Sequence, residues 1–444
     1  MNILSLIRSD ASGFAEPVAS QPFSGHFYLG YPVVDLDGAR ESHTMLGFGA
    51  SFTDAACHVI DRLPDAAQAA LLRDLFAPDG LNLSIGRLNV GSSDYATRVY
   101  SYNDVPGDVG MQHFSIDPDR RYLIPLLRRV KALRTDLFLF SSPWSPPGWM
   151  KLGGSMCGGY LKREYLPAFA DYYVAYLKAY REAGVPIDAL TLQNEADTDQ
   201  GGRMPASILH PEYEMELIGR LLPPRLKAAG LDTRIWMYDH NYSGWRRVLA
   251  MLDDPEVRRH TDAVAFHPYD GVPGMTRPIR AKYPDLPFHL TEKGPNLRKD
   301  SAESSLLWWS RTIAGALNAG CGSFVGWNYA LDENGCPNVG PYDCAGLVEI
   351  HSRTGAVTPS IQYQAFRHFA PFIPRGASLL DAPREGVFPE QLDCVVCRRP
   401  DGRHVVVAGN PDGGPAGLQI KLAGQYLRLL LPRESMTTLV CDPP

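Results

Sequence analysis

The sequence lacks the features that would assign it to a membrane or nucleic-acid-binding class. It has no apolar run of about 18 residues or more, the length that a helix needs to cross a bilayer. It also has no excess of basic residues, because 43 Lys and Arg stand against 49 Asp and Glu and give a net charge of −6. Nucleic acids and anionic membranes favour basic surfaces, so we expect no nucleic-acid partner and no integral membrane contact. The oligomeric state stays open.

Targeting signals and cysteine frameworks are also scarce. Met1–Asp10 has neither a basic leader nor a long apolar segment, which favours a cytoplasmic location unless a leader has been removed. Eight cysteines are too few for a disulfide scaffold in 444 residues. Cys394 and Cys397 have the spacing of zinc and redox pairs, but they lie in a valine-rich run without a second pair. Cys336 and Cys344 could bridge a loop, although free thiols are favoured. We therefore predict no metal and no other cofactor.

The sequence does contain a repeated alternation of short β-rich runs and helical segments. Each run is continuously apolar and ends in polar or aromatic residues, a pattern typical of strands that are buried on both faces of a parallel sheet. The runs are Leu46–Asp54, Leu83–Asp94, Leu137–Trp149, Leu190–Glu195, Ile235–Asn241, Ala263–Asp270, Phe288–Gly294 and Ser323–Asp332.

The segments between these runs have apolar residues at spacings of three and four, which indicates amphipathic helices. The clearest examples are Ala66–Phe76, Tyr122–Arg134, Ala168–Ala183, Met215–Ala229 and Ser304–Ala319. Eight such βα units predict an α/β fold with a (β/α)8 (TIM) barrel. A doubly wound open sheet is disfavoured, because Gly47-Phe-Gly49 lacks the third glycine of a dinucleotide-binding turn.

The two ends of the chain have a different pattern. After a helical segment at Ser360–Phe369, strand signals occur at Cys394–Arg398, His404–Ala408, Leu418–Leu422, Tyr426–Leu431 and Thr437–Cys441. The N-terminal part also indicates strands, around Phe27–Leu29 and Val33–Leu36. Because chain ends often lie close together, we predict one β-sandwich built from both termini. Its parts are residues 1–45 and 375–444, and the barrel takes residues 46–374.

Polar and aromatic residues gather where the predicted strands end, which is where barrel enzymes carry their working residues. They are Asp54, Arg87, Trp144, Asn194, Glu195, Asp239, His267, Tyr269, Glu292, Trp327 and Asn328. Glu195 closes the fourth run and Glu292 the seventh, so both carboxyl groups should lie on one rim. Glycoside hydrolysis needs such a pair, one group protonated to donate to the leaving oxygen and the other ionised.

Other residues at these positions suit a sugar. Tryptophan side chains offer flat apolar faces for stacking on sugar rings, and polar side chains can bond hydroxyl groups. The tryptophans are Trp144, Trp149 and Trp327, and the polar candidates are Asp54, Arg87 and Asn194. Taken singly, each has a structural alternative: a loop glutamate can be solvated, a loop tryptophan can pack, and His267 can orient a neighbour. Asp197 and Asp199 resemble a metal cluster, but a solvated loop is favoured.

Several motifs, in this order and spacing, resemble glycoside hydrolase family 30, and within it the retaining β-glucosylceramidase branch. They are Gly47-Phe-Gly-Ala-Ser-Phe-Thr-Asp54, Tyr100-Ser-Tyr-Asn-Asp104, Ser142-Pro-Trp144-Ser-Pro-Pro-Gly-Trp149, Gln193-Asn-Glu195, His267-Pro-Tyr269, Thr291-Glu292, Gly326-Trp327-Asn328 and Tyr363–Gly376. The resemblance implies that Glu195 is the acid/base and Glu292 the nucleophile. It also implies that His267 and Tyr269 support Glu292. The residues that it places around the cleaved sugar are Asp54, Arg87, Trp144, Asn194, Trp327 and Asn328.

The sequence also departs from this branch. Ala196 stands where a proline often follows the acid/base, Lys293 follows the nucleophile, and Gly326 replaces an acidic residue. We expect a retaining β-glycosidase that acts on β-glucosides, with a glycolipid such as glucosylceramide as the first candidate substrate. The alternatives are β-xylosidase, β-fucosidase or β-1,6-glucanase activity, or a non-catalytic glycolipid- or carbohydrate-binding protein. A metal-dependent barrel hydrolase is disfavoured, because Leu46–Asp54 has no paired histidines.

Overall fold

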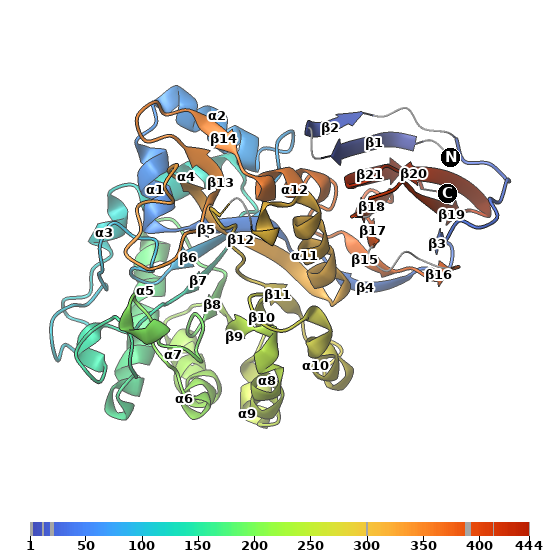
Figure 1. Cartoon of the computed structure of the whole chain (residues 1–444). Coiled ribbons are helices and arrows are strands. Elements are labelled where there is room, and N and C mark those ends of the chain that lie inside the picture. Colours follow the sequence, from blue (N-terminus) through green and yellow to red (C-terminus); the bar gives the residue numbers. More distant parts are fainter. Residues whose placement is uncertain are drawn as a thin grey trace.

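The computed structural model describes residues 3–10, 13–17, 22–298, 301–386, 392–411 and 413–443. Eight parallel strands form its centre, and each overlaps one of the eight predicted runs (Figure 1). They are β5 (Gly47–Phe52), β6 (Ile85–Asn89), β7 (Phe138–Ser142), β8 (Ala189–Thr191), β9 (Arg234–Asn241), β10 (Ala263–His267), β11 (Phe288–Leu290) and β12 (Cys321–Leu331). Because β12 pairs with both β11 and β5, the sheet closes on itself. The predicted (β/α)8 barrel is confirmed.

The inside of the barrel is a packed apolar core. Its buried members include Ile85, Phe138, Phe140, Trp236 and Val325. Since the outer faces of the same strands are covered by helices, both faces are dry, which explains the continuously apolar runs. Two further strands, β13 (Gly346–Ile350) and β14 (Val357–Pro359), continue the sheet beside β12.

Helices surround the barrel, as Figure 1 shows. They are α1 (Asp54–Asp61), α2 (Asp65–Phe76), α3 (Asp117–Arg120), α4 (Leu123–Leu133), α5 (Leu166–Glu182), α6 (Pro211–Glu216), α7 (Leu222–Ala228), α8 (Trp245–Leu252), α9 (Pro255–His260), α10 (Arg277–Lys282), α11 (Leu306–Asn318) and α12 (Ile361–Phe369). The predicted helix at Met215–Ala229 is not continuous, because a π-helical turn at Leu217–Leu221 separates α6 from α7. Pro223 and Pro224 have no backbone N–H to donate, so the regular hydrogen-bond ladder cannot pass through them.

The two ends of the chain form two further sheets beside the barrel (Figure 1). Their strands are β1 (Ile3–Asp10), β2 (Gly13–Pro17), β3 (Val33–Asp35), β4 (Arg40–Thr44), β15 (Ser378–Asp381), β16 (Arg384–Glu385), β17 (Asp393–Arg398), β18 (His404–Asn410), β19 (Ala416–Leu422), β20 (Gln425–Leu431) and β21 (Ser435–Cys441). One sheet has the order β2-β1-β21-β18-β17-β15-β4 and the other β16-β3-β19-β20, so both contain strands from both termini. The predicted strand at Phe27–Leu29 is wrong: this segment is irregular, and Leu29 is 91% exposed, so it has no apolar face to bury.

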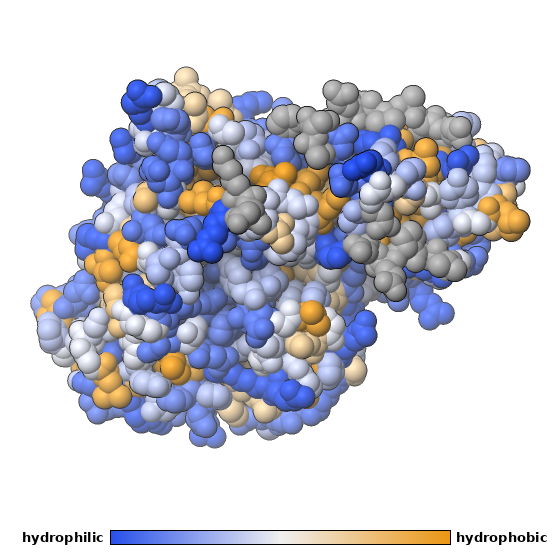
Figure 2. Space-filling model, in the orientation of Figure 1, coloured by the Kyte–Doolittle hydropathy of each residue, from blue (hydrophilic) through white to orange (hydrophobic). Residues whose placement is uncertain are grey.

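All eight cysteines are free thiols, including Cys336 and Cys344. Burial raises the pKa of Cys394 to about 11 and that of Cys397 to about 12, which keeps both thiols protonated. In the described part of the chain, no helix is long and apolar enough to span a bilayer. On the face in Figure 2, hydrophobic residues form small separate groups among hydrophilic ones.

Candidate active site

Glu195 and Glu292 meet at the rim formed by the carboxyl ends of the barrel strands. One carboxyl oxygen of each and a ring nitrogen of His267 lie within 4.8 Å of one another. Glu292 is buried, whereas 14% of the Glu195 side chain is exposed. The backbone of Glu195 is left-handed, with φ at 51°, and its N–H donates to the Asp239 carbonyl at 3.0 Å. Such a conformation is uncommon outside glycine, and the surrounding contacts hold it in place.

Arg87, on β6, orients Glu292. Its fully buried guanidinium donates to Glu292 Oε2 at 2.6 Å and to Asp239 Oδ2 at 2.8 Å. The Tyr269 hydroxyl donates to Glu292 Oε1 at 3.0 Å, so each carboxyl oxygen of Glu292 has one donor. Both contacts are strongest to a carboxylate and therefore favour the ionised form of this side chain. Tyr269 thus contacts Glu292 as the family resemblance implies.

Asp239 is the hub of the network, although its sequence context indicated only a place at a strand end. It is fully buried and accepts hydrogen bonds from the side chains of Arg87, Ser142, Thr191, His267 and Thr291. Burial opposes ionisation, but the charge of Arg87 and these hydrogen bonds lower the pKa of Asp239 far below its usual range. Asp239 is also the extra residue of a bulge in β9, because Tyr238 and His240 pair with consecutive residues of β10. Bulges re-aim side chains at strand ends.

His267 lies close to Glu292, but among the described residues its hydrogen bonds go to Glu195 and Asp239. Its Nδ1 lies 3.4 Å from Glu195 Oε1, and its Nε2 lies 3.0 Å from Asp239 Oδ1. Burial alone would lower the pKa of His267, but the charge of Glu292 and the contacts with Asp239 and Glu195 raise it to about 9. The ring is therefore protonated at neutral pH and donates to both carboxylates.

The two glutamates titrate as an interacting pair. Burial raises the pKa of Glu292, and the charge of Glu195 adds to this effect, against the opposing charges of His267 and Arg87. Burial also disfavours ionised Glu195, but the hydrogen bond and charge of His267 outweigh it and lower the pKa of Glu195. The two carboxyl groups therefore affect each other's protonation, and the charges of His267 and Arg87 act on both.

Two tryptophans and two asparagines complete the surroundings of the pair. Trp144 and Trp327 stack with ring centroids 4.9 Å apart, and each is 2% exposed, so they form a rigid apolar wall. Asn194 Oδ1 accepts from Arg87 at 2.9 Å, which turns its amide nitrogen away from the arginine. Asn328 Oδ1 accepts from Thr53, while its buried nitrogen has no hydrogen-bond partner among the described residues.

Asp54, a predicted sugar ligand, also has a structural role. One of its oxygens accepts from the Tyr122 hydroxyl and the other from the Thr97 N–H, so it ties the start of α1 to the segment that follows β6. Asp94, on that same segment, is the acid that sequence reasoning missed. Its Oδ1 is buried with no partner in the described part of the chain, and burial together with the charges of the two glutamates raises the pKa of Asp94 well above its usual range.

The remaining candidates have structural contacts. Lys293 points away from the carboxyl group of Glu292: its ammonium lies 2.7 Å from Glu303 Oε1 and 4.4 Å from the centre of the Tyr269 ring. Trp149 donates to the Asn103 carbonyl and meets Tyr165 edge to face, which is a packing role. Asp197 forms an ion pair with Arg247, and one of its oxygens lies 3.3 Å from His240 Nδ1.

Carboxylate and imidazole groups this close could also hold a cation. Here, however, both nitrogens of His267 already face carboxylates, and the Arg87 guanidinium occupies one oxygen of Glu292. This donor set fits a hydrogen-bonded acid/base site better than a metal centre.

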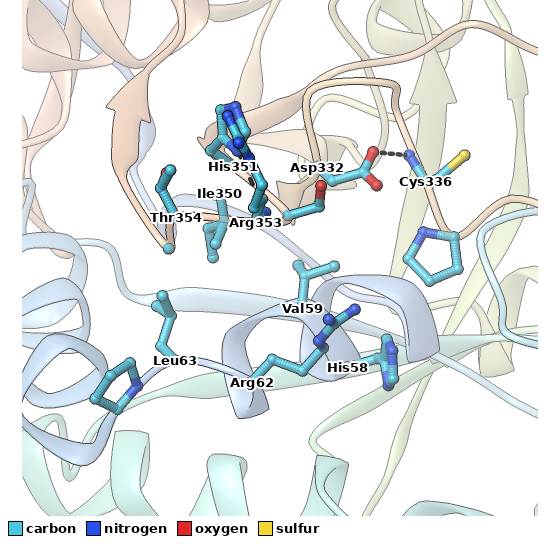
Figure 3. Close-up of a pocket in the computed structure, with 14 residues that line it drawn as sticks. His58, Val59, Arg62, Leu63, Asp332, Cys336, Ile350, His351, Arg353 and Thr354 are labelled. Atoms are coloured by element: carbon cyan, nitrogen blue, oxygen red, sulfur yellow. Dashed lines mark hydrogen bonds between the residues drawn. The ribbon is translucent and has the colours of Figure 1, made fainter.

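A separate cavity of about 450 Å³ lies between α1 and the segments after β12 and β13 (Figure 3). His58, Arg62, Asp332, His351 and Arg353 line it. None of the predicted site residues is among its lining residues, so it is distinct from the glutamate site.

A closed (β/α)8 barrel with two adjacent strand-end glutamates defines the class of barrel glycoside hydrolases. Residues 45–373 match the glycosyl hydrolase family 30 TIM-barrel domain, and the chain belongs to this family.

The chain is similar to proteins named as endo-1,6-beta-D-glucanases and to proteins named as glucosylceramidases. It is 28% identical to an endo-1,6-beta-D-glucanase of Neurospora crassa, covering 98% of this chain and 92% of that protein. It is 31% identical to the endo-1,6-beta-D-glucanase BGN16.3 of Trichoderma harzianum, covering 92% and 86%. Identity to the lysosomal acid glucosylceramidase of Mus musculus is 28%, covering 85% and 77%. Among solved structures, the endo-beta1,6-glucanase BT3312 has the same fold, with a TM-score of 0.89, 23% identity and full coverage of both chains.

Proposed function

We propose that this protein is a retaining β-glycosidase in which Glu292 is the nucleophile and Glu195 the acid/base. The observation that carries the proposal is the spacing of the glutamates, whose nearest oxygens lie within 4.8 Å. Retaining enzymes have carboxyl groups about 5–5.5 Å apart, whereas inverting enzymes need about 6.5–9.5 Å to admit a water molecule. The short spacing leaves room for direct attack on the sugar.

The reaction proceeds in two displacements. Glu292 attacks the anomeric carbon while protonated Glu195 gives its proton to the departing glycosidic oxygen, so a glycosyl ester forms as the glycosidic bond breaks. Glu195 then takes a proton from water, which attacks the anomeric carbon and releases Glu292 as a carboxylate. Arg87 and Tyr269 hold Glu292 in place through both steps by donating to its two oxygens.

Glu195 carries the proton when the substrate reacts. A glycosidic oxygen can accept but cannot donate a hydrogen bond, so it binds favourably only to protonated Glu195. Positive charge that develops at the anomeric carbon in the transition state is stabilised by ionised Glu292.

The sugar ring lies between the pair and the tryptophan wall in this proposal. The amide nitrogen of Asn194 is available to donate to a ring hydroxyl, because Arg87 occupies its oxygen. The unpartnered oxygen of Asp94 can accept from another hydroxyl, and Trp144 and Trp327, which are almost fully buried, back the site. Asp54 stays a candidate ligand, since each of its oxygens accepts from one donor and has a lone pair left for a sugar hydroxyl.

The proposed substrate is a β-1,6-linked glucan. Two fungal relatives that match the chain over more than nine-tenths of its length are named as endo-1,6-beta-D-glucanases, which supports this choice over glucosylceramide. The sequence alone favoured a glucosylceramidase-like activity and gave β-1,6-glucanase activity as an alternative. We now propose the alternative ahead of the first expectation. The mouse relative keeps glucosylceramide as the second candidate substrate.

A substrate panel tests the proposal. Wild type and Glu292→Gln are assayed side by side on β-1,6-glucan, glucosylceramide in detergent micelles, and aryl β-glucosides, β-xylosides and β-fucosides. We expect wild type to cleave β-1,6-glucan with the highest kcat/KM and the variant to be inactive on every substrate. Preferential cleavage of glucosylceramide would refute the substrate, and full activity of Glu292→Gln would refute the mechanism.

A further inference from the structure

Gln200 contacts the proposed acid/base directly, although no motif in the sequence pointed to it. Its side-chain Nε2 donates to Glu195 Oε2 at 2.7 Å. The other oxygen of Glu195 faces His267 at the longer distance of 3.4 Å. Among the described residues, Gln200 therefore makes the shorter of the two side-chain hydrogen bonds to this carboxyl group.

The loop that carries Gln200 holds it in an unusual conformation. Gln200 has a φ of 55°, and the next two residues, Gly201 and Gly202, also have positive φ. The Asp199 side chain accepts from the Gly201 N–H and fixes the turn. A left-handed non-glycine residue costs free energy unless its surroundings require it, so this turn maintains the side chain in a defined place.

A second loop fixes the amide of Gln200. The hydroxyl of Tyr342, between β12 and β13, donates to Gln200 Oε1. The carbonyl of Tyr342 in turn accepts from the Tyr95 hydroxyl at 2.8 Å and from Asn338 Nδ2 at 2.6 Å. Because Tyr342 donates to the amide oxygen, the amide nitrogen must face Glu195.

We propose that Gln200 is a positioning residue for Glu195, and that Tyr342 and Gln200 together form a clasp on the leaving-group side of the site. The inference rests on the proposed role of Glu195 as the acid/base. Since the leaving oxygen is the atom that Glu195 protonates, the residues at Glu195 Oε2 flank the departing group. The clasp joins the loop after β8 to the loop after β12 across this side.

The clasp serves both protonation states of Glu195. An acid/base residue is protonated before the first displacement and ionised after it. Ionised Glu195 accepts from the amide nitrogen, as in the structure. Protonated Glu195 keeps lone pairs on Oε2 that accept from the same amide nitrogen, so its single O–H stays free to donate to the glycosidic oxygen.

The test compares leaving groups. Gln200→Ala and Tyr342→Phe are assayed on phenyl and 2,4-dinitrophenyl glycosides of β-1,6-linked diglucose, beside Gln425→Ala and Tyr160→Phe as exposed controls. The phenyl compound needs protonation of its leaving group and the dinitrophenyl compound does not. We expect Gln200→Ala to lower kcat/KM for the phenyl compound about tenfold. This loss is smaller than the ~10²-fold or more that general acid–base catalysis supplies, as expected for a residue that positions the acid and does not replace it. The dinitrophenyl compound should change little in the glycosylation step.

The pH profile supplies a readout that a purely structural role would not move. An N–H donor stabilises ionised Glu195, so its removal in Gln200→Ala should shift the basic limb of kcat/KM to higher pH. Tyr342→Phe removes one hydroxyl only, and it should give a smaller shift in the same direction. Equal losses on both substrates, or an unchanged basic limb in both variants, would overturn the proposal.

Glu195→Ala separates this inference from the proposed function. We expect it to lose activity on the phenyl compound and to keep the glycosylation step on the dinitrophenyl compound. Full activity on both would refute the acid/base assignment itself. If Glu195→Ala behaves as expected while Gln200→Ala matches its control, only the clasp is refuted.

Discussion

Replacing Arg87 with methionine should damage both stability and activity, because this one side chain neutralises two buried carboxylates. Its guanidinium donates to Glu292, Asp239, Asn194 and Ser142 and to the Thr291 carbonyl, and its side chain has no solvent exposure. Breaking a buried pair by removing one partner costs about 3–5 kcal/mol, since it leaves an uncompensated charge. We therefore expect Arg87→Met to lose about that much free energy of unfolding.

The double variant tests the cause. In Arg87→Met with Asp239→Asn, one of the stranded charges is gone, so the double variant should be more stable than the sum of the single losses predicts. Arg73→Met is the matched control, because Arg73 and its partner Asp79 are both largely exposed and such pairs are worth about 1 kcal/mol or less.

Urea titrations of wild type, Arg87→Met, Asp239→Asn, the double variant and Arg73→Met measure these differences. The kcat/KM on β-1,6-glucan is measured for the same proteins. The activity of Arg87→Met should fall at least about a hundredfold, since Glu292 loses a strong charge-assisted hydrogen bond. The reasoning is refuted if Arg87→Met is as stable as Arg73→Met, or if the double variant shows strictly additive losses.

Three further predictions follow from the same contacts. Tyr269→Phe removes a donor to Glu292 and should raise its pKa, which moves the acidic limb of kcat/KM to higher pH; an unmoved limb would contradict the contact. The folded pKa of His267, about 9, exceeds its ordinary value of 6.5, so its stabilisation is complete below pH 6.5 and is lost as pH rises to 9. Urea titrations at pH 6 and pH 9 should show wild type losing free energy of unfolding relative to His267→Gln, and parallel changes would contradict this. Incubation with EDTA should leave kcat/KM unchanged, and a loss that Zn²⁺ or Ca²⁺ restores would point to a metal.

The barrel could be predicted because its strands are buried on both faces. Runs such as Phe138–Ser142 are buried at every position and therefore show no alternation of apolar and polar residues. The helices between the runs keep a 3.6-residue period of apolar residues. The failures have local causes. Leu29 is apolar but largely exposed, and Phe27 is about half exposed. The prolines after Leu222 allow a π-turn that a periodic pattern cannot show.

The meeting of Glu195 and Glu292 could also be predicted, because parallel strands end on one rim. Arg87, Asp239 and Tyr269 were also among the strand-end candidates, but most of the contacts that they make could not be predicted. The bulge at Asp239 decides which side chains face inward at the end of β9, and it leaves no mark in the hydrophobic pattern. Gln200 and Tyr342 lie 142 residues apart in two loops, where no periodicity links them. The roles of the site residues stay predictions until they are measured.

Covalent trapping tests the central claim most directly. A 2-deoxy-2-fluoro β-glycoside with a dinitrophenyl leaving group forms the glycosyl ester and slows its hydrolysis, and mass spectrometry of the digested protein locates the label. We predict a single modified peptide with the sugar on Glu292, and no label in Glu292→Gln. A label on another carboxyl group, or turnover of the natural substrate with inversion at the anomeric carbon, would contradict the account.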